Sequence, residues 1–342
     1  MVGYIAKGQA GINGTITIKA YIDKDKILIS DTYPEGEVVI DGVTYYNGTP
    51  NTNKTVFTTE EWNSLNTNGI SFQVKVEANE GIWVDDINGE NDMLNIKNIF
   101  TNEQKSSITE INFIRMSEEE INTHVNLIDL TDSNGSGVVK GWIDNNKLYI
   151  ASPGITYFPQ DSSGLFVRFS ALQIINFNNI NTSNVTLMPG MFSGCSSLTT
   201  LDLSIFDTSN VTIINQMFYN CTNLVNVILN NFNTNSLTMM GEMFSGCSSL
   251  TTLDLSSFDT SNVTVMGDMF ANDINLTTIY VGNNWSTSSV TGTQNMFNGC
   301  TSLKGGGTPQ TTYDANHIDK EYARIDGGAN SSTPGYLTLK TN

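Results

Sequence analysis

The chain is short of positive charge. Its 16 Lys and Arg residues stand against 34 Asp and Glu residues, which gives a net charge of −18. Because this charge repels nucleic-acid phosphates and anionic lipids, we expect no nucleic-acid partner. The sequence also lacks any apolar run near the roughly 20 residues that span a bilayer, which predicts no membrane insertion.

Groups that usually carry catalysis or hold metals are scarce. The two histidines, His124 and His317, cannot form a cluster with further histidines. No nucleophile elbow, phosphate loop or His-Glu-x-x-His motif occurs. The acidic segment 77–92 departs from EF-hand spacing, which favours a solvated loop over a calcium site. We therefore expect no catalytic residues, no cofactor and no metal, and a protein that is not an enzyme.

What the chain has instead is a repeat. Its clearest copy, residues 191–211, contains Leu-x-x-Leu-x-Leu, and the Met-Phe step that opens it returns 26 residues later at Met217. Leu165 opens the first of six such units, which together fill residues 165–303. A period in the twenties with this leucine spacing is typical of a leucine-rich-repeat solenoid.

Each unit predicts a short strand, a buried aromatic residue and a return. Leu201 and Leu203 alternate with polar residues, which is the pattern of a strand with one buried face. Apolar residues three or four apart, as at Val263 and Met266, predict a short or 3₁₀-like helical return. No unit can bury its apolar residues alone, so the units must fold as a stack. The aromatic residues expected inside are Phe206, Phe232, Phe258 and Trp285.

One position of the repeat holds all the cysteines, with Phe169 and Asp273 in the two remaining units. Disulfides or a metal ladder are one interpretation. However, equivalent positions on neighbouring coils lie near the limit for a disulfide, and a phenylalanine could not take part. A column of small buried hydrophobic residues is favoured. The cysteines are Cys195, Cys221, Cys247 and Cys300.

Residues 1–92 are predicted to form a separate β-sandwich or barrel-like domain. Short alternating runs separated by turn signals support this prediction, and Thr58 and Glu61 have the spacing of a helix capping box. The expected strands cover residues 15–21, 26–29, 37–46 and 70–77.

The other flanking segments are predicted to cap the stack, so the whole chain is mainly β with short helices. Residues 93–164 form the N-terminal cap, with a helix from residue 118 to about 125 and a hairpin of residues 138–143 and 147–150. Residues 304–342 form the C-terminal cap. The side chains expected to cover the open end are Tyr322, Ile325, Tyr336 and Leu337.

The repeat Met-Phe-Ser-Gly-Cys-Ser-Ser-Leu-Thr-Thr-Leu-Asp-Leu resembles the BspA-type leucine-rich repeats of bacterial surface proteins. The tail, with Tyr-Ala-Arg-Ile-Asp-Gly-Gly and Pro-Gly-Tyr, is similar to the segment that commonly closes those domains. The resemblance covers roughly residues 110 to 340. It implies a bacterial, gut-associated origin, a role in surface attachment and no catalysis.

The outward positions of the predicted strands are the candidate binding site, since solenoids commonly bind on this face. Polar groups around an aromatic ring would suit a host surface glycan or a polar protein loop, while an ordinary solvated face is the alternative. Asp202 and Asp254 would lie about 9–10 Å apart, with Ile228 between them, which makes catalysis improbable. The candidate residues are Asn176, Thr200, Asp202, Ser204, Asn226, Ile228, Asn230, Thr252, Asp254, Ser256, Thr278 and Tyr280.

Two functions remain open. The start of the chain shows no signal peptide, which favours a non-enzymatic bacteriophage virion protein, a tail or head fibre or decoration. Its residues 1–92 would dock onto other virion proteins while the solenoid attaches to the host. A fibre would be a homo-oligomer, although no heptad pattern predicts a coiled coil. The alternative is a BspA-like adhesin ectodomain on the bacterial cell surface, whose export signal lies outside this sequence.

Overall fold

The computed structural model describes residues 92–97, 99–132 and 137–341, together with the backbone of four short strands closer to the N-terminus. The chain divides into two compact units, Met1–Gly89 and Glu90–Asn342. The described residues are mainly β with a few short helices, as expected.

In the first unit the described strands form two antiparallel pairs. β1 (Ala6–Lys7) pairs with β4 (Ile82–Trp83), and β2 (Glu37–Ile40) pairs with β3 (Val43–Tyr46). The prediction of one continuous strand over 37–46 is therefore wrong. The missed signal is the Asp-Gly dipeptide at 41–42, a sequence that favours a turn between two strands.

No closed barrel occurs among these described strands. Several expectations for this region concern residues that the structure does not describe. They are the strands at 15–21, 26–29 and 70–77, the capping box at Thr58 and most of the acidic segment 77–92.

The second unit opens with a five-stranded mixed sheet in the order β11-β6-β9-β8-β7. Its first four strands in the chain are β6 (Glu110–Arg115), β7 (Ile128–Asp129), β8 (Lys140–Asp144) and β9 (Lys147–Ser152). The predicted hairpin is confirmed as β8 and β9. Asn145 and Asn146 join them with φ of 47° and 63°, the left-handed conformation that a two-residue type I′ turn requires.

Two short helices, α2 (Asn102–Ser107) and α3 (Glu118–Ile121), each begin with a capping box. Ser117 Oγ accepts a hydrogen bond from the Glu120 N–H (3.2 Å), and the Glu120 carboxylate accepts one from the Ser117 N–H (2.9 Å). The predicted start of α3 is thus confirmed, but the helix does not continue to residue 125. Val125 is 77% exposed, so another turn would bury no apolar side chain there.

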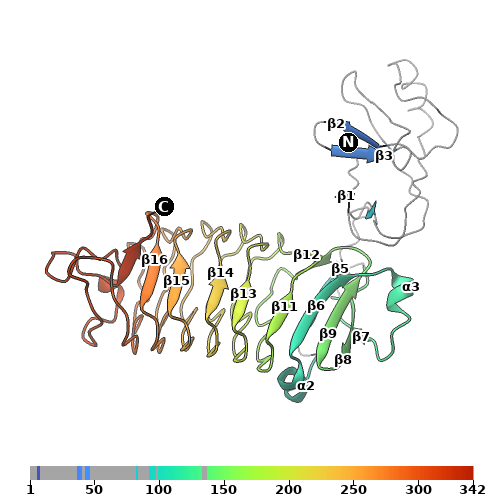
Figure 1. The fold of residues 1–342 in the computed structure, drawn as a ribbon, viewed down its shortest axis with the longest axis horizontal. Helices are drawn as coiled ribbons and strands as arrows, with labels where there is room; N and C mark the ends of the chain where they lie inside the picture. Colours follow the sequence, from blue (N-terminus) through green and yellow to red (C-terminus); the bar gives the residue numbers. More distant parts are fainter. Residues whose placement is uncertain are drawn as a thin grey trace. The chain divides into compact units, whose positions relative to one another are not determined.

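Beyond this sheet the chain winds in parallel coils (Figure 1). Leu201 pairs with Val227, and Leu253 pairs with Ile279, so each repeat position stacks on itself. Five coils contribute one strand each: β11 (Ile174–Asn176), β13 (Thr200–Asp202), β14 (Asn226–Ile228), β15 (Thr252–Leu255) and β16 (Thr278–Val281). Next to β16 lies β17 (Leu337–Leu339), a strand from the C-terminal segment that pairs with β16 in parallel.

Shorter parallel contacts hold the other sides of the coils together. β12 (Ile180–Asn181) and β5 (Asp92–Met93) flank β10 (Thr156–Tyr157). A ladder of single-residue bridges then runs along the stack through Asp161, Leu187, Ile213, Met239, Val265 and Gly292.

The return between strands is not helical, so that prediction is wrong. After β12 the chain makes successive turns, with Gly190 and Gly194 at φ of 62° and 74°. Residues with left-handed φ values interrupt a right-handed helix. Alternate N–H groups here donate to the next coil, as Phe192 does to Met217 O (2.9 Å). Hydrogen bonding between coils therefore replaces hydrogen bonding within a helix.

The core is a stack of similar layers, one for each coil. Leu201 and Leu203 are buried, as are Phe206 and its equivalents, although Trp285 is only half-buried and donates Nε1–H to Ala323 O (3.0 Å). Further inside, rings from successive coils stack with centroids 5.3 to 6.1 Å apart. This phenylalanine column consists of Phe166, Phe192, Phe218, Phe244, Phe270 and Phe297.

All four cysteines are free and buried beside this column. Each thiol donates to the carbonyl of the column phenylalanine in the preceding coil, for example Cys195 Sγ to Phe166 O at 3.2 Å. The same bond is made by Cys221, Cys247 and Cys300, at 3.2, 3.1 and 2.8 Å. The thiols therefore fill space and satisfy carbonyls, in agreement with the favoured interpretation.

Buried threonines form a second ladder. Thr208 Oγ1 donates to Asn233 O (3.0 Å) and accepts from the Asn233 N–H (2.8 Å), so one hydroxyl satisfies two backbone groups of the next coil. Thr182, Thr234 and Thr260 repeat this arrangement. The Thr-rich sequence of the repeat thus has a structural role.

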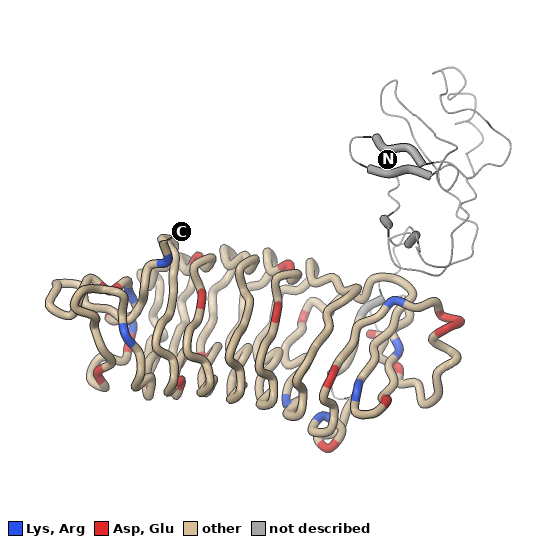
Figure 2. The backbone as a smooth tube through the Cα atoms, viewed as in Figure 1, with Lys and Arg blue, Asp and Glu red and all other residues tan. Residues whose placement is uncertain are grey.

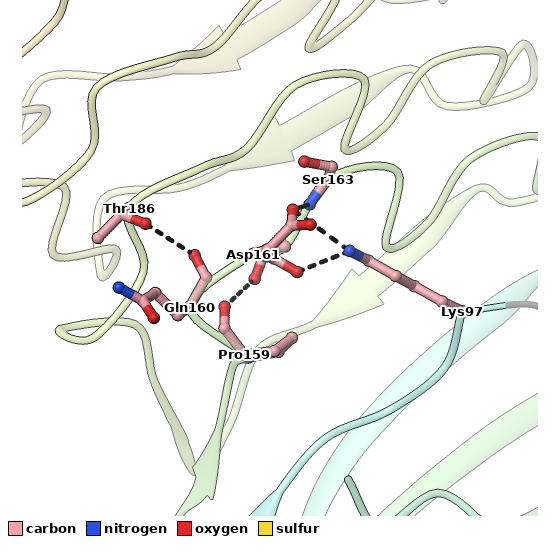
Figure 3. A network of polar contacts seen from close by, with 7 residues as sticks. Lys97, Pro159, Gln160, Asp161, Ser163 and Thr186 are labelled. Atoms are coloured by element: carbon pink, nitrogen blue, oxygen red, sulfur yellow. Dashed lines mark hydrogen bonds and ion pairs between the residues drawn. The ribbon is translucent and has the colours of Figure 1, made fainter. Parts of the chain in front are cut away.

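Lys97 holds the segment that leads into the first coil, through Asp161 (Figure 3). Its ammonium donates to Asp161 O (2.7 Å) and lies 3.3 Å from Asp161 Oδ1, which also accepts from the Ser163 N–H (2.9 Å). Next to it, Gln160 O accepts from the Thr186 N–H (2.9 Å) and hydroxyl (3.3 Å). The cap and the following coil are therefore joined side by side.

Of the four side chains expected to cover the open end of the stack, three pack against the core and one does not. Tyr336 and Leu337 are fully buried, and Tyr322, in the 3₁₀-helix η1 (Lys320–Tyr322), packs against the core. Ile325, however, is 39% exposed, so its predicted role as a cover is wrong. Ala323 is buried instead, because the bend after η1 turns Ile325 outward.

A buried carboxylate organises the same cap. Asp326 accepts hydrogen bonds from the N–H groups of Gly307, Thr311, Gly328 and Gly335 and from the Thr311 hydroxyl, at 2.6 to 3.2 Å. These bonds fasten residues 307–311 and Gly335 to the segment that carries Asp326.

Candidate binding face

The outward side chains of β11, β13, β14, β15 and β16 form one row of neighbouring positions, called here the strand face. In β13, Leu201 is buried while Thr200 and Asp202 are exposed, which is the alternation that strand geometry imposes. Every predicted site residue lies on these strands or within two residues of a strand end. These residues are Asn176, Thr200, Asp202, Ser204, Asn226, Ile228, Asn230, Thr252, Asp254, Ser256, Thr278 and Tyr280.

The middle column of the strand face alternates carboxylates with larger apolar groups. Asp202 pairs in register with Ile228, and Asp254 pairs with Tyr280. Neighbouring positions are about 4.8 Å apart. Ile228 and Tyr280 are half-buried, so each keeps part of its apolar surface open to solvent. A ligand lying along this column would meet polar and apolar groups in turn.

Both carboxylates are held by turns at their strand ends. Asp202 Oδ1 accepts from the Ser204 N–H (2.9 Å), and Asp254 Oδ1 accepts from the Ser256 N–H (3.0 Å). Such Asx turns fix the carboxylate while leaving its second oxygen available. At Asp202 no described residue uses that second oxygen.

At the C-terminal end, Lys340 follows β17 and forms an ion pair with Asp254 on β15, although β16 with Tyr280 lies between these two strands. Partial burial alone would raise the pKa of Asp254, but the hydrogen bonds from Lys340 and Ser256 outweigh it and lower the pKa. Sequence reasoning missed Lys340, because it lies outside the repeat and no periodicity relates it to β15.

At the N-terminal end, Asn176 is engaged in the sheet. Its Nδ2 donates to Asn112 Oδ1 (2.7 Å) on β6 and lies 3.4 Å from Glu110, which is paired with Lys147 (2.7 Å). The amide nitrogen of Asn176 is therefore already engaged in hydrogen bonds within the sheet.

Beyond Asn112 the same side of the sheet is covered. Trp142 is in register with Tyr149, and the two rings stack at 5.3 Å, while His124 stacks on Trp142 at 3.8 Å. Ile121 of α3 packs in the same small cluster. The open part of the strand face therefore begins at β11, a boundary that the sequence did not reveal.

Few charges lie on the coils (Figure 2). Arg168 is the one basic residue between positions 165 and 303. With Asp254 neutralised by Lys340, Asp202 is the remaining charge of the middle column. Recognition here would depend on hydrogen bonding and apolar contact more than on net charge.

The residues that the structure describes meet neither the requirements of a metal site nor those of a membrane-spanning helix. They contain no cluster of three or more His, Cys, Asp or Glu side chains placed to hold a metal ion. None of their helices combines the length and the apolar composition that a bilayer crossing requires.

A family model described as "Mycoplasma protein of unknown function, DUF285" matches residues 160–253 and, in an overlapping second copy, residues 225–323. Both matches fall on the coils that carry the strand face. The match is consistent with a BspA-type surface repeat protein. No characterised protein and no solved structure matches the chain.

Proposed function

We propose that the chain is a non-enzymatic bacterial surface protein of the BspA-like kind. In this proposal residues 165–303 form a leucine-rich-repeat solenoid, and its strand face attaches to a glycan or protein on a host surface. The observation that carries the proposal is the middle column, where Ile228 and Tyr280 stand half-exposed beside the carboxylates of Asp202 and Asp254 on parallel strands.

The chemistry of this column suits a carbohydrate. Sugar rings present hydroxyl groups around apolar C–H faces, and tyrosine offers both an apolar ring and a hydroxyl. Asp202, whose second oxygen bonds none of the residues that the structure describes, is placed to accept from a sugar hydroxyl. The strands hold these groups at fixed spacing, so binding would lose little conformational entropy.

The family match favours the adhesin over the virion protein. The matching family model is described as a protein of Mycoplasma, a cellular organism, and that description names no bacteriophage. The cell surface is accordingly the proposed location.

Two features support a role without catalysis. The ion pair with Lys340 and the lowered pKa of Asp254 disfavour it as a general acid. Burial raises the pKa of the Cys195 and Cys247 thiols, which disfavours nucleophilic attack.

The proposal is tested by measuring binding of the full chain to a glycan array and to whole epithelial and bacterial cells. A variant with Asp202→Ala, Ile228→Ala and Tyr280→Ala should lose binding. A control variant with Ile205→Ala, on an exposed loop outside the strand face, should retain it. Equal binding by the two variants would remove the strand face from the proposal, and no binding by the wild type would argue against attachment.

A further inference from the structure

Asp273 occupies the cysteine position of the coil that carries β16, and it is fully buried. Among the side chains that the structure describes, its Oδ1 and Oδ2 are the buried atoms without a hydrogen-bond partner. A carboxylate in such a place would lose its hydration and gain nothing in return. The side chain therefore needs an explanation that packing alone does not give.

The groups that face Asp273 offer no compensating charge. They are the thiols of Cys247 and Cys300 on the two neighbouring coils. Both thiols already donate elsewhere, to Phe218 O and Phe270 O. The nearby Cys247 N–H, which would favour an anion, donates to Phe244 O (2.9 Å). Burial consequently raises the pKa of Asp273 well above its ordinary value, and the Cys247 N–H opposes this only weakly.

The carbonyl of Phe244 occupies the position that accepts a thiol hydrogen bond in the other coils. In the other coils the side chain at the cysteine position donates to the column phenylalanine of the preceding coil, as Cys247 does to Phe218 O (3.1 Å). For Phe244 the equivalent side chain is Asp273. A carboxylate cannot donate, whereas a carboxylic acid has one O–H donor. Only the protonated form of Asp273 reproduces the bond that the thiols make.

We propose that Asp273 is held as a neutral acid whose O–H donates to the Phe244 carbonyl, and that loss of this proton opens the C-terminal end of the stack. The coil that would open carries β16, which holds Tyr280 and pairs with the capping strand β17. This proposal goes beyond attachment to a host surface. It makes the opening of the C-terminal coil depend on pH, whether or not a ligand is bound.

The direction of the pH effect follows from linkage. The closed state binds a proton that the opened coil releases, so the stabilisation is complete below the ordinary aspartate pKa of 3.8 and is lost as pH rises toward the folded-state pKa. Between these two pKa values the coil releases one proton when it opens. The equilibrium constant for opening, called here the opening constant, therefore rises about tenfold for each pH unit.

Hydrogen exchange of the full chain, followed by mass spectrometry across pH, tests this. After correction for the intrinsic exchange rate, the opening constant of segments in β16 and β17 should rise about tenfold per pH unit in the wild type. Asp273→Cys, which restores the residue of four other coils, should abolish the slope and lower the opening constant at about pH 7. Asp202→Asn on the strand face should behave as the wild type. A wild type without the slope, or a slope that survives in Asp273→Cys, overturns the proposal.

Infrared spectroscopy gives a second readout on the wild type alone. A carbonyl band of a neutral carboxylic acid should persist at about pH 7, where exposed carboxyl groups are ionised. Its absence would overturn the proposal even if Asp273→Cys failed to fold, and its loss in a folded Asp273→Cys would assign the band.

Discussion

The ring of Tyr336 stands at 81° to the ring of Phe297, with centroids 5.2 Å apart, and so ends the phenylalanine column with an edge-on contact. At the other end Phe113 meets Phe166 at 90° and 6.3 Å. The rings between them are stacked within 20° of parallel. A repeat can extend such a column without limit, and it is the aromatic residues of the two caps that stop it.

Replacing Tyr336 should therefore destabilise the stack from its C-terminal end. Tyr336→Ala leaves a large cavity against Phe297 and should cost about 3–5 kcal/mol of unfolding free energy. Tyr336→Phe keeps the ring and loses the hydroxyl, which accepts from the Asp314 N–H (2.9 Å) and donates to Asp314 O (3.4 Å), at a cost of about 1 kcal/mol. Urea unfolding followed by circular dichroism measures both. Equal losses in the two variants would show that the ring does not close the column.

The threonine ladder predicts a cost for an almost isosteric change. Thr234→Val removes the hydroxyl that bonds both the N–H and the C=O of Asp259, and should cost about 1–3 kcal/mol because it leaves both groups without their partner. Thr234→Ser should cost less, since it keeps the hydroxyl. The exposed Thr200→Val is the control and should change stability by less than about 0.5 kcal/mol. Thermal unfolding of the three variants decides whether the ladder stabilises the stack.

The cysteines should be inert while the protein is folded. Burial raises the pKa of Cys221 to about 12, so hardly any reactive thiolate exists at about pH 8. A thiol reagent should label none of the four cysteines in the native protein and all four after unfolding in urea. Rapid labelling of the native protein would mean that the column is accessible from solvent.

Asp326 should make the C-terminal cap sensitive to acid. Burial alone would raise its pKa, but hydrogen bonds from Thr311, Gly328 and Gly307 outweigh this and lower it below the ordinary 3.8. The stabilisation from its charge is thus complete above the unfolded-state pKa and is lost as pH falls through the folded-state value. In hydrogen exchange between about pH 6 and about pH 3, Asp326→Asn should open more at the upper end and depend less on pH. An unchanged pH profile in Asp326→Asn would assign the acid sensitivity to another group.

The repeat explains which parts of this fold the sequence could predict. A fixed period places equivalent residues on top of one another, so one buried leucine in β13 identifies its counterparts in β14 and β15. The outward residues of the strand face follow from the same alternation. The return segments were mispredicted because apolar spacing suits both a helix and a series of turns, and the hydrogen bonds between coils that decide the matter are not local.

The ends of the stack were harder because no period extends into them. Ile325 is as apolar as Leu337, yet the bend after η1 leaves Ile325 exposed while Leu337 is buried. The ion pair between Lys340 and Asp254 spans 86 residues, and only the pairing of β17 with β16 brings the two side chains together. Asp273 was visible as a departure from the cysteine pattern, but its lack of partners appears only once the surrounding coils are packed.

The central claim, that the strand face attaches to a host surface, is tested most directly by two tyrosines on different sides of the coils. Tyr280 belongs to the strand face, whereas Tyr219 lies in the return after the Met217–Phe218 step and is likewise half-buried. The measurement is the dissociation constant of the full chain on cells or on the glycan that it binds best. Tyr280→Ala should weaken binding by about tenfold or more, which corresponds to about 1.4 kcal/mol, while Tyr219→Ala leaves it unchanged. Loss of binding in Tyr219→Ala with Tyr280→Ala unaffected would contradict the account.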